Sequence, residues 1–298
     1  MEDVKIELQR FLGETGVKQA AVSRAIGYDK SGGALSQWLS GKYPGDNERI
    51  ADAVRGFLRR EKAKTLKPKQ EISFVMTSTA LDAFDVAETC QIGGEIGVLI
   101  GRAGVGKTFF AKEYTRQNTG VILIEADLSY TTRDVFMELH RKCGGNGAPS
   151  LSKLKDDVIE RLRGSGRLVI VDEAEFLPVR AIDLLRRVYD KAGVGILFVG
   201  LPRLFEGLIS KHNDYAYILS RIGVKGVMGS LGLDDVSMIV SQGGVTDPDV
   251  CGAFLDECGG NARKLKMIFH KCVKSKEYDP ERPITPELIR QKAQRLLI

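Results

Sequence analysis

The sequence predicts an α/β protein in which a parallel sheet lies between two all-helical regions. Short apolar runs of strand length occupy residues 95–101, 121–127, 167–175 and 195–200. Segments with helical spacing lie between these runs, at residues 107–117, 131–142, 151–163 and 179–191. Continuous apolar strands joined by helices are typical of a parallel sheet that is covered on both faces. A fifth strand is expected within residues 222–231, where glycines interrupt the pattern.

Four regions follow from these patterns. Residues 1–60 are expected to form an all-α domain, and residues 232–298 a second, C-terminal one. The charged run 59–71 contains Pro68 and few apolar residues, so a linker is expected at residues 61–72. The parallel-sheet domain is then expected to span residues 73–231.

The composition is that of an ordinary globular protein, with 43% hydrophobic and 28% charged residues among 298. The apolar runs are too short to span a bilayer, and the charged first ten residues lack the apolar core of a secretory signal. Five cysteines without a CxxC pair indicate neither a zinc site nor a disulfide framework. A reducing, cytoplasmic location is therefore expected, without a membrane partner.

Charge is distributed unevenly along the chain. Residues 1–70 hold 14 Lys and Arg against 9 Asp and Glu, and residues 259–298 hold 10 against 4. The residues between them are net acidic. Basic ends favour binding to a polyanion such as DNA, although a solvated lysine-rich surface gives the same count.

A phosphate-binding loop follows the first predicted strand. The residues Gly101, Arg102, Ala103, Gly104, Val105, Gly106, Lys107 and Thr108 match the pattern G-x-x-x-x-G-K-[ST], with a strand before and a helix after. The loop's backbone N–H groups and the helix N-terminus would bind the phosphates of ATP, with Phe109 as the next cofactor-binding residue. Lys107 would reach the β- and γ-phosphates, and the Thr108 hydroxyl would bind Mg²⁺.

Two carboxylates end the third predicted strand. The apolar run 168–171 is followed directly by Asp172 and Glu173. Both are therefore expected at the carboxyl edge of the sheet, where ligands bind in open parallel sheets. Asp172 would hold Mg²⁺ and Glu173 would polarise the water that attacks the γ-phosphate.

Four motifs in this order, "GRAGVGKT", "LVIVDE", "YILSRI" and "GGNARKLK", resemble those of AAA+ ATPases. The two helical segments before "LVIVDE" resemble the initiator and helicase-loader branch. The resemblance implies an AAA+ P-loop parallel sheet with a C-terminal helical lid. It also implies that Arg221 is an arginine finger reaching a neighbouring subunit and that Arg263 is a second sensor on the lid. Either arginine could instead be an ordinary surface charge.

One position departs from the family pattern. Many AAA+ proteins place Asn, Ser or Thr at the end of the fourth strand, where it positions water. This chain has Gly200 at that position. A polar first sensor is therefore not evident, and slow or partner-dependent turnover is expected.

The segment 16–42 resembles a repressor-type helix-turn-helix. Its apolar residues have the spacing of two short helices, which Gly27 and Gly41 can end. Trp38 is expected in the core. The turn between the helices is longer than usual, and a small bundle for protein contacts is the alternative. The DNA-binding residues expected here are Lys30, Ser31, Ala34, Gln37 and Lys42.

A second DNA-binding surface is expected in the loop after the second strand. This loop leaves the same sheet edge as the phosphate loop, so Tyr130, Thr132 and Arg133 are candidates for contacts with the DNA backbone. A threonine at this point could equally cap the following helix.

A helix-turn-helix joined to an AAA+ module resembles the ATP-dependent target-DNA activators of transposing phages. The resemblance implies a largely non-specific double-stranded DNA-binding ATPase that uses ATP and Mg²⁺. It would form a homo-oligomer on DNA, as a helical filament or ring, and deliver target DNA to a transposase in the cytoplasm of the host. A replicative helicase loader or initiator and an ATP-switched transcriptional regulator are the alternatives.

Overall fold

The structure, a computed structural model, describes residues 2–28, 33–65, 72–147, 149–204, 206, 212–278 and 283–296. The chain divides into two compact units, Met1–Lys69 and Gln70–Ile298. Among the helices within these ranges, none is long and apolar enough to cross a membrane.

The first unit is all-helical and contains α1 (Glu2–Thr15), α2 (Gln19–Ala25), α3 (Gly33–Leu39) and α4 (Asn47–Thr65). Leu8, Val22, Leu35 and Trp38 are buried in its core, at most 1% exposed. The indole N–H of Trp38 donates to the carbonyl oxygen of Asn47 at 3.2 Å. The prediction that Trp38 is a core residue is therefore confirmed.

The last helix of this unit is longer than predicted. The linker was expected to begin at residue 61, but α4 continues to Thr65. Residues 61–64 are Glu, Lys, Ala and Lys, which have high helix propensity, so a charged composition does not end the helix here. The rest of the expected linker up to residue 71 lies outside the described residues.

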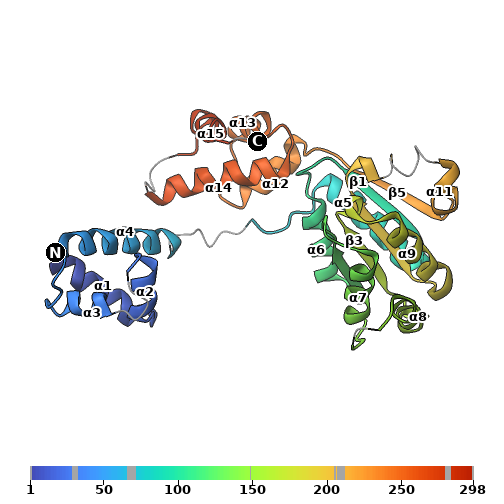
Figure 1. Cartoon of the computed structure of the whole chain (residues 1–298). Helices are drawn as coiled ribbons and strands as arrows, with labels where there is room; N and C mark the ends of the chain where they lie inside the picture. The colour runs from blue at the N-terminus through green and yellow to red at the C-terminus, as the bar shows by residue number, and fades with distance from the viewer. Residues whose placement is uncertain are drawn as a thin grey trace. The chain divides into compact units, whose positions relative to one another are not determined.

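The second unit is built on a five-stranded parallel sheet with the order β2-β3-β4-β1-β5. Figure 1 shows the sheet with β1, β3 and β5 labelled. The strands are β1 (Ile96–Gly101), β2 (Val121–Glu125), β3 (Leu168–Asp172), β4 (Gly195–Gly200) and β5 (Ile222–Met228). All five predicted strands are confirmed. β1, β3 and β4 are buried along their whole length, which explains their continuous apolar sequences.

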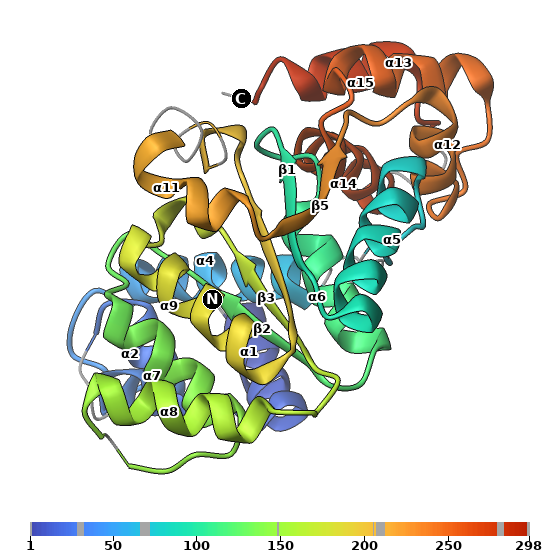
Figure 2. The same cartoon turned by 90° about the vertical axis from the view of Figure 1, so that its right-hand side faces the viewer.

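Helices cover both faces of the sheet (Figure 2). One face packs against α5 (Ser78–Gly93) and α6 (Lys107–Gln117), and the other against α7 (Thr132–Lys142), α8 (Leu151–Leu162) and α9 (Val179–Ala192). The four predicted helices are confirmed within one or two residues. α5 was not predicted, because much of its buried face consists of alanine, which carries little apolar signal.

The C-terminal part of the second unit is helical, as predicted. It contains α12 (Leu233–Ser241), α13 (Pro248–Cys258), α14 (Ala262–Tyr278) and α15 (Pro286–Ala293), which share a separate apolar core. This helical domain is bonded to the sheet domain at several points. The amide of Leu231 donates to the carbonyl oxygen of Gly260 at 2.8 Å, and that of Ser78 donates to Asp235 Oδ1 at 2.9 Å.

Two further short elements of the described chain belong to the sheet domain. A turn of 3-10 helix, η1 (Ala174–Phe176), directly follows the end of β3, and α11 (His212–Leu219) precedes β5. η1 places its residues beside the carboxyl end of β4, next to the pocket described below.

Candidate nucleotide site

A pocket of about 470 Å³ lies at the carboxyl edge of the sheet. Its wall is formed by the loop after β1, the start of α6, the ends of β3 and β4, and the start of α14. Polar lining residues that were predicted from the sequence are Lys107, Thr108, Asp172, Glu173 and Arg263. Five side chains predicted separately from three motifs therefore meet in one pocket.

The loop after β1 has the backbone that its glycines allow. Gly104 has a φ of 83°, in the left-handed region that glycine adopts readily. A Cβ atom at Gly104 would lie 2.4 Å from Asn261 Oδ1, so the close approach of Asn261 also requires glycine. The loop ends at the N-terminus of α6, where free backbone N–H groups attract anions.

Most of the predicted cofactor-binding residues line the pocket: Ala103, Gly104, Gly106, Lys107, Thr108 and Phe109. Gly101, Arg102 and Val105 do not. Val105 is 5% exposed and packs in the core, so it anchors the loop. Gly101 and Arg102 use their carbonyl oxygens, which accept hydrogen bonds from Lys107 Nζ at 2.7 and 3.0 Å.

The ammonium group of Lys107 lies among charges of both signs. Burial lowers its pKa, the carboxylates of Glu175 and Asp172 oppose that shift, and the positive charge of Arg263 adds to it. A phosphate group in the pocket would add negative charge beside this half-buried ammonium and favour its charged form.

Asp172 is the most buried acid of the site, with 1% exposure. Its carboxylate accepts a hydrogen bond from the backbone N–H of Glu173 at 2.9 Å, and the neighbouring Thr108 side chain acts to lower its pKa. Burial nevertheless raises its pKa. A hydroxyl oxygen beside a carboxylate is a donor set that suits Mg²⁺, and the cation would relieve the buried negative charge. Thr108 and Asp172 therefore fit the metal role predicted for them.

Glu173 has an unusual backbone. Its φ of 54° and ψ of 37° lie in the left-handed region, and among the described residues no other non-glycine residue has a positive φ. Such a conformation is strained and is often found at functional sites. Desolvation raises the pKa of Glu173, and the nearby charges of Asp172 and Glu175 raise it further.

The helical domain contributes Arg263 and Asn261. The backbone N–H of Arg263 donates to the carbonyl oxygen of Gly104 at 3.0 Å, while its side chain lines the pocket. Asn261 Nδ2 donates to the carbonyl oxygen of Ala103 at 2.9 Å, and Asn261 Oδ1 accepts from the amide of Lys264 at 3.0 Å. Asn261 thus begins α14 and also binds the phosphate loop, a second role that the sequence prediction missed.

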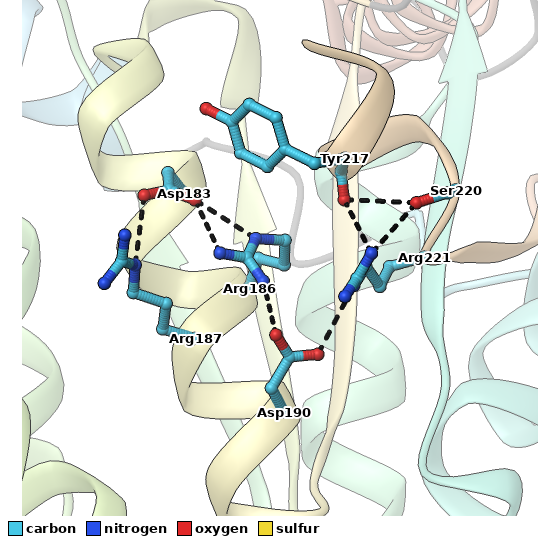
Figure 3. Close-up of polar contacts among 7 residues, drawn as sticks. All are labelled: Asp183, Arg186, Arg187, Asp190, Tyr217, Ser220 and Arg221. Atoms are coloured by element: carbon cyan, nitrogen blue, oxygen red, sulfur yellow. Dashed lines mark hydrogen bonds and ion pairs between the residues drawn. The ribbon is translucent and has the colours of Figure 1, made fainter.

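Arg221, the predicted arginine finger, does not line the pocket of its own chain. It lies between α9, α11 and β5 (Figure 3). Arg221 Nη1 donates to the carbonyl oxygen of Tyr217 at 3.3 Å and to Ser220 Oγ at 3.0 Å, and Nε lies 3.5 Å from Asp190 Oδ1. Asp190 also binds Arg186. The side chain of Arg221 is 41% exposed.

Gly200, the last residue of β4, lines the pocket beside Leu201. No side chain therefore projects from the first-sensor position. The carboxylate of Glu175, from η1, reaches this point, where its Oε2 accepts from the amide of Leu201 at 3.1 Å. Glu175 was not predicted as a site residue, because the sequence does not show that η1 packs beside the end of β4.

The predicted DNA-binding residues of the first unit are partly described. Gln37 and Lys42 are exposed and Ala34 is half-buried, on or just after α3. Lys30 and Ser31 lie outside the described residues. Gly27 and Gly41 follow α2 and α3 with positive φ values, as predicted for residues that end helices.

The structure describes all three candidate residues of the loop after β2. Thr132 is 9% exposed and is the first residue of α7, while Thr131 forms the N-cap, in a capping box with Asp134. Tyr130 is half-buried and donates from its hydroxyl to Glu138 Oε2 at 2.7 Å. Arg133 is the exposed one of the three candidates, whereas Tyr130 and Thr132 are held within the loop and the start of α7.

The sheet order, the phosphate loop and the helical domain give this chain a P-loop fold similar to that of AAA+ proteins. Residues 91–208 match the family model described as AAA domain. The fold resembles that of the ORC2 protein of Aeropyrum pernix, with a TM-score of 0.58 at 17% identity over 76% of this chain and 69% of that chain. The ORC1 protein of the same organism, solved in complex with DNA, gives a TM-score of 0.58 at 18% identity, covering 76% and 67%.

Proteins of Mu-like phages resemble this chain over most of its length. It is 26% identical over 274 residues to the Mu-like prophage FluMu DNA transposition protein B of Haemophilus influenzae, which covers 88% of this chain and 94% of that protein. It is 29% identical over 230 residues to the ATP-dependent target DNA activator B of Escherichia phage Mu, covering 76% and 72%.

Proposed function

We propose that this protein is an ATPase that assembles on double-stranded DNA when it binds ATP and presents that DNA to a transposase. The observation that carries the proposal is the convergence of Lys107, Thr108, Asp172, Glu173 and Arg263 on one pocket. The names of the phage relatives, a transposition protein and a target DNA activator, support the biological setting.

ATP hydrolysis follows from the chemistry of these residues. The phosphate loop and Lys107 bind the β- and γ-phosphates, and Arg263 brings a second cation to the γ-phosphate. Thr108 and Asp172 would hold Mg²⁺, which neutralises charge on the phosphates. Glu173, whose pKa is raised, accepts a hydrogen bond from the attacking water and orients it.

Oligomerisation completes the site. Arg221 is half-exposed and lies outside its own chain's pocket, as a residue must if it acts on the nucleotide of a neighbouring subunit. An arginine supplied in this way stabilises the charge that develops in phosphoryl transfer. ATP at the subunit interface thus favours a homo-oligomer on DNA, as a filament or ring, and hydrolysis weakens it.

DNA binding is assigned to the first unit, as a helix-turn-helix, and to the exposed Arg133 of the second. Gln37 and Lys42 are exposed at and after α3, where a recognition helix would meet the major groove. Lys42 would contact phosphates, and phosphate contacts are largely independent of DNA sequence and weaken as the salt concentration increases.

Electron microscopy with linear duplex DNA and ATP tests this function, with the Lys107→Ala variant as comparison. We expect the wild type to coat unrelated DNA sequences when Mg²⁺ and ATP are present, and Lys107→Ala to leave DNA bare. Coating that is independent of ATP would contradict the proposal. Discrete complexes at one sequence would favour a transcriptional regulator, and capture of a replicative helicase instead of a transposase would favour a helicase loader.

A further inference from the structure

We infer that Glu175 takes the place of the first sensor in this ATPase, by positioning the attacking water from the turn after β3. This inference rests on the proposed ATPase function. It explains why a chain with an otherwise complete nucleotide site has glycine at the end of β4, where many AAA+ proteins place a polar side chain.

The space at the end of β4 is already filled by Glu175. A Cβ atom at Gly200 would lie 2.4 Å from Glu175 Oε2, far below a normal van der Waals contact. The carboxylate therefore occupies the volume in which a side chain at position 200 would begin. Glycine at this position is what allows Glu175 to reach the pocket.

The carboxylate is held firmly at this position. Its Oε2 accepts from the amide of Leu201 at 3.1 Å. The turn that carries it is closed by hydrogen bonds from Phe176 N to Glu173 O at 3.0 Å and from Leu177 N to Ala174 O at 3.1 Å. Among the residues that the structure describes, none donates a hydrogen bond to the second oxygen, Oε1, which is therefore available to a ligand.

Glu175 also belongs electrostatically to the site. It lines the pocket together with Lys107 and Glu173. Burial lowers the pKa of Lys107, and among the carboxylates that oppose this shift Glu175 acts most strongly. A residue of the surrounding scaffold that merely packed against β4 would not act on the phosphate-binding lysine in this way.

The carboxylate of Glu175 differs chemically from the asparagine amide that serves as the first sensor in many AAA+ proteins. An ionised carboxylate only accepts hydrogen bonds, so Glu175 binds the hydrogen of a water and not the oxygen of the γ-phosphate. Glu173 and Glu175 then hold one water from two sides. Because the same carboxylate accepts a hydrogen bond from the amide of Leu201, the position of the water depends on the segment that follows β4. The expected effect of losing it is on kcat, with ATP affinity retained.

The test is a double-mutant cycle on steady-state ATP hydrolysis, with ATP affinity measured in parallel by a fluorescent analogue. Glu175→Ala should lower kcat by roughly 100-fold, the usual size of a lost water-positioning group, with ATP affinity changed by less than about 3-fold. Gly200→Asn alone should lower kcat as well, because its Cβ displaces the carboxylate. The double variant Glu175→Ala/Gly200→Asn should regain at least about 10-fold over Glu175→Ala, since it restores a polar sensor in the vacated space.

Controls separate this inference from the proposed function. Glu160→Ala, which removes an exposed carboxylate of α8 paired with Arg163, should leave kcat unchanged. If Glu175→Ala does not fold, the isosteric Glu175→Gln takes its place, and a kcat at least about 10-fold lower is expected. Wild-type turnover in the Glu175 variants, or a double variant no faster than Glu175→Ala, would overturn the inference alone. A wild type that binds ATP without hydrolysing it would overturn both.

Discussion

The contact between the phosphate loop and the helical domain depends on Asn261, and its two hydrogen bonds can be removed one at a time. Asn261→Ser should keep the N-cap of α14, because serine caps helices as well as asparagine does. The shorter side chain no longer reaches the carbonyl oxygen of Ala103, to which Asn261 Nδ2 now donates at 2.9 Å. Asn261→Ala loses this bond and also the cap, in which Oδ1 accepts from Lys264 N at 3.0 Å.

The two losses have similar sizes. An N-cap contributes about 1 kcal/mol to the free energy of unfolding, and a neutral hydrogen bond about 1 kcal/mol. In a unit of roughly 150–250 residues, 1 kcal/mol lowers Tm by about 2–4 °C, so we expect about 2–4 °C for Asn261→Ser and about 4–8 °C for Asn261→Ala. Calorimetry of the unit Gln70–Ile298 within the full chain would measure both.

A matched control removes a cap of the same helical domain without touching the phosphate loop. Thr285 Oγ1 accepts from the amide of Leu288 at 3.3 Å at the start of α15, so Thr285→Ala should lower Tm by about 2–4 °C. Its ATP affinity should stay at the wild-type value, whereas both Asn261 variants should bind ATP more weakly. Equal Tm values for wild type and Asn261→Ser, or equal values for the two Asn261 variants, would refute this reasoning.

Three further predictions concern strain, the arginine finger and the thiols. Glu173→Gly should abolish hydrolysis but raise the free energy of unfolding by roughly 1 kcal/mol, because glycine relieves the strain of the left-handed backbone. Glu173→Gln should abolish hydrolysis without this gain, and equal stabilities of the two variants would argue against strain. Asp190→Ala should lower the ATPase activity of the protein assembled on DNA by only about 2–5-fold, because a half-exposed ion pair contributes little. Arg221→Ala should lower it far more, and equal effects of the two variants would contradict a supporting role for Asp190. Burial raises the pKa of Cys90 to about 12 and that of Cys272 to about 11, and it should keep both thiols from reacting with a thiol reagent in the native protein. Half-buried Cys143 should be modified first, and all five cysteines should react after denaturation. Rapid modification of Cys90 in the native protein would contradict this packing.

The fold could be predicted well wherever local sequence reports burial. Strands buried on both faces read as continuous apolar runs, and the phosphate loop reads as a motif because its glycines and lysine are adjacent in sequence. α5 was missed because alanine, which forms much of its buried face, has little apolar contrast with its exposed face. The burial of Thr132, a candidate DNA contact, was not visible in the sequence, because it depends on which of two neighbouring threonines caps α7.

The parts of the site that sequence could not reveal depend on contacts between distant residues. Asn261 binds a carbonyl oxygen that lies 158 positions earlier in the chain. Glu175 binds the amide of Leu201, 26 positions later in the chain, at the end of β4. In the sequence, Gly200 indicated only that a polar side chain is absent from this position. Neither interaction has a local motif, because each is created by the packing of η1, β4 and α14 around the pocket.

The central claim is that Lys107, Thr108, Asp172 and Glu173 bind one magnesium–triphosphate. Titration calorimetry of the full chain with ATP, with and without Mg²⁺, measures this most directly. We expect one ATP per chain and an affinity that depends on Mg²⁺. Lys107→Ala should weaken binding by roughly 10–100-fold, as for a lost charged hydrogen bond, and Thr108→Ala should remove most of the Mg²⁺ dependence. Wild-type affinity in Lys107→Ala, or binding that ignores Mg²⁺ in the wild type, would contradict the claim.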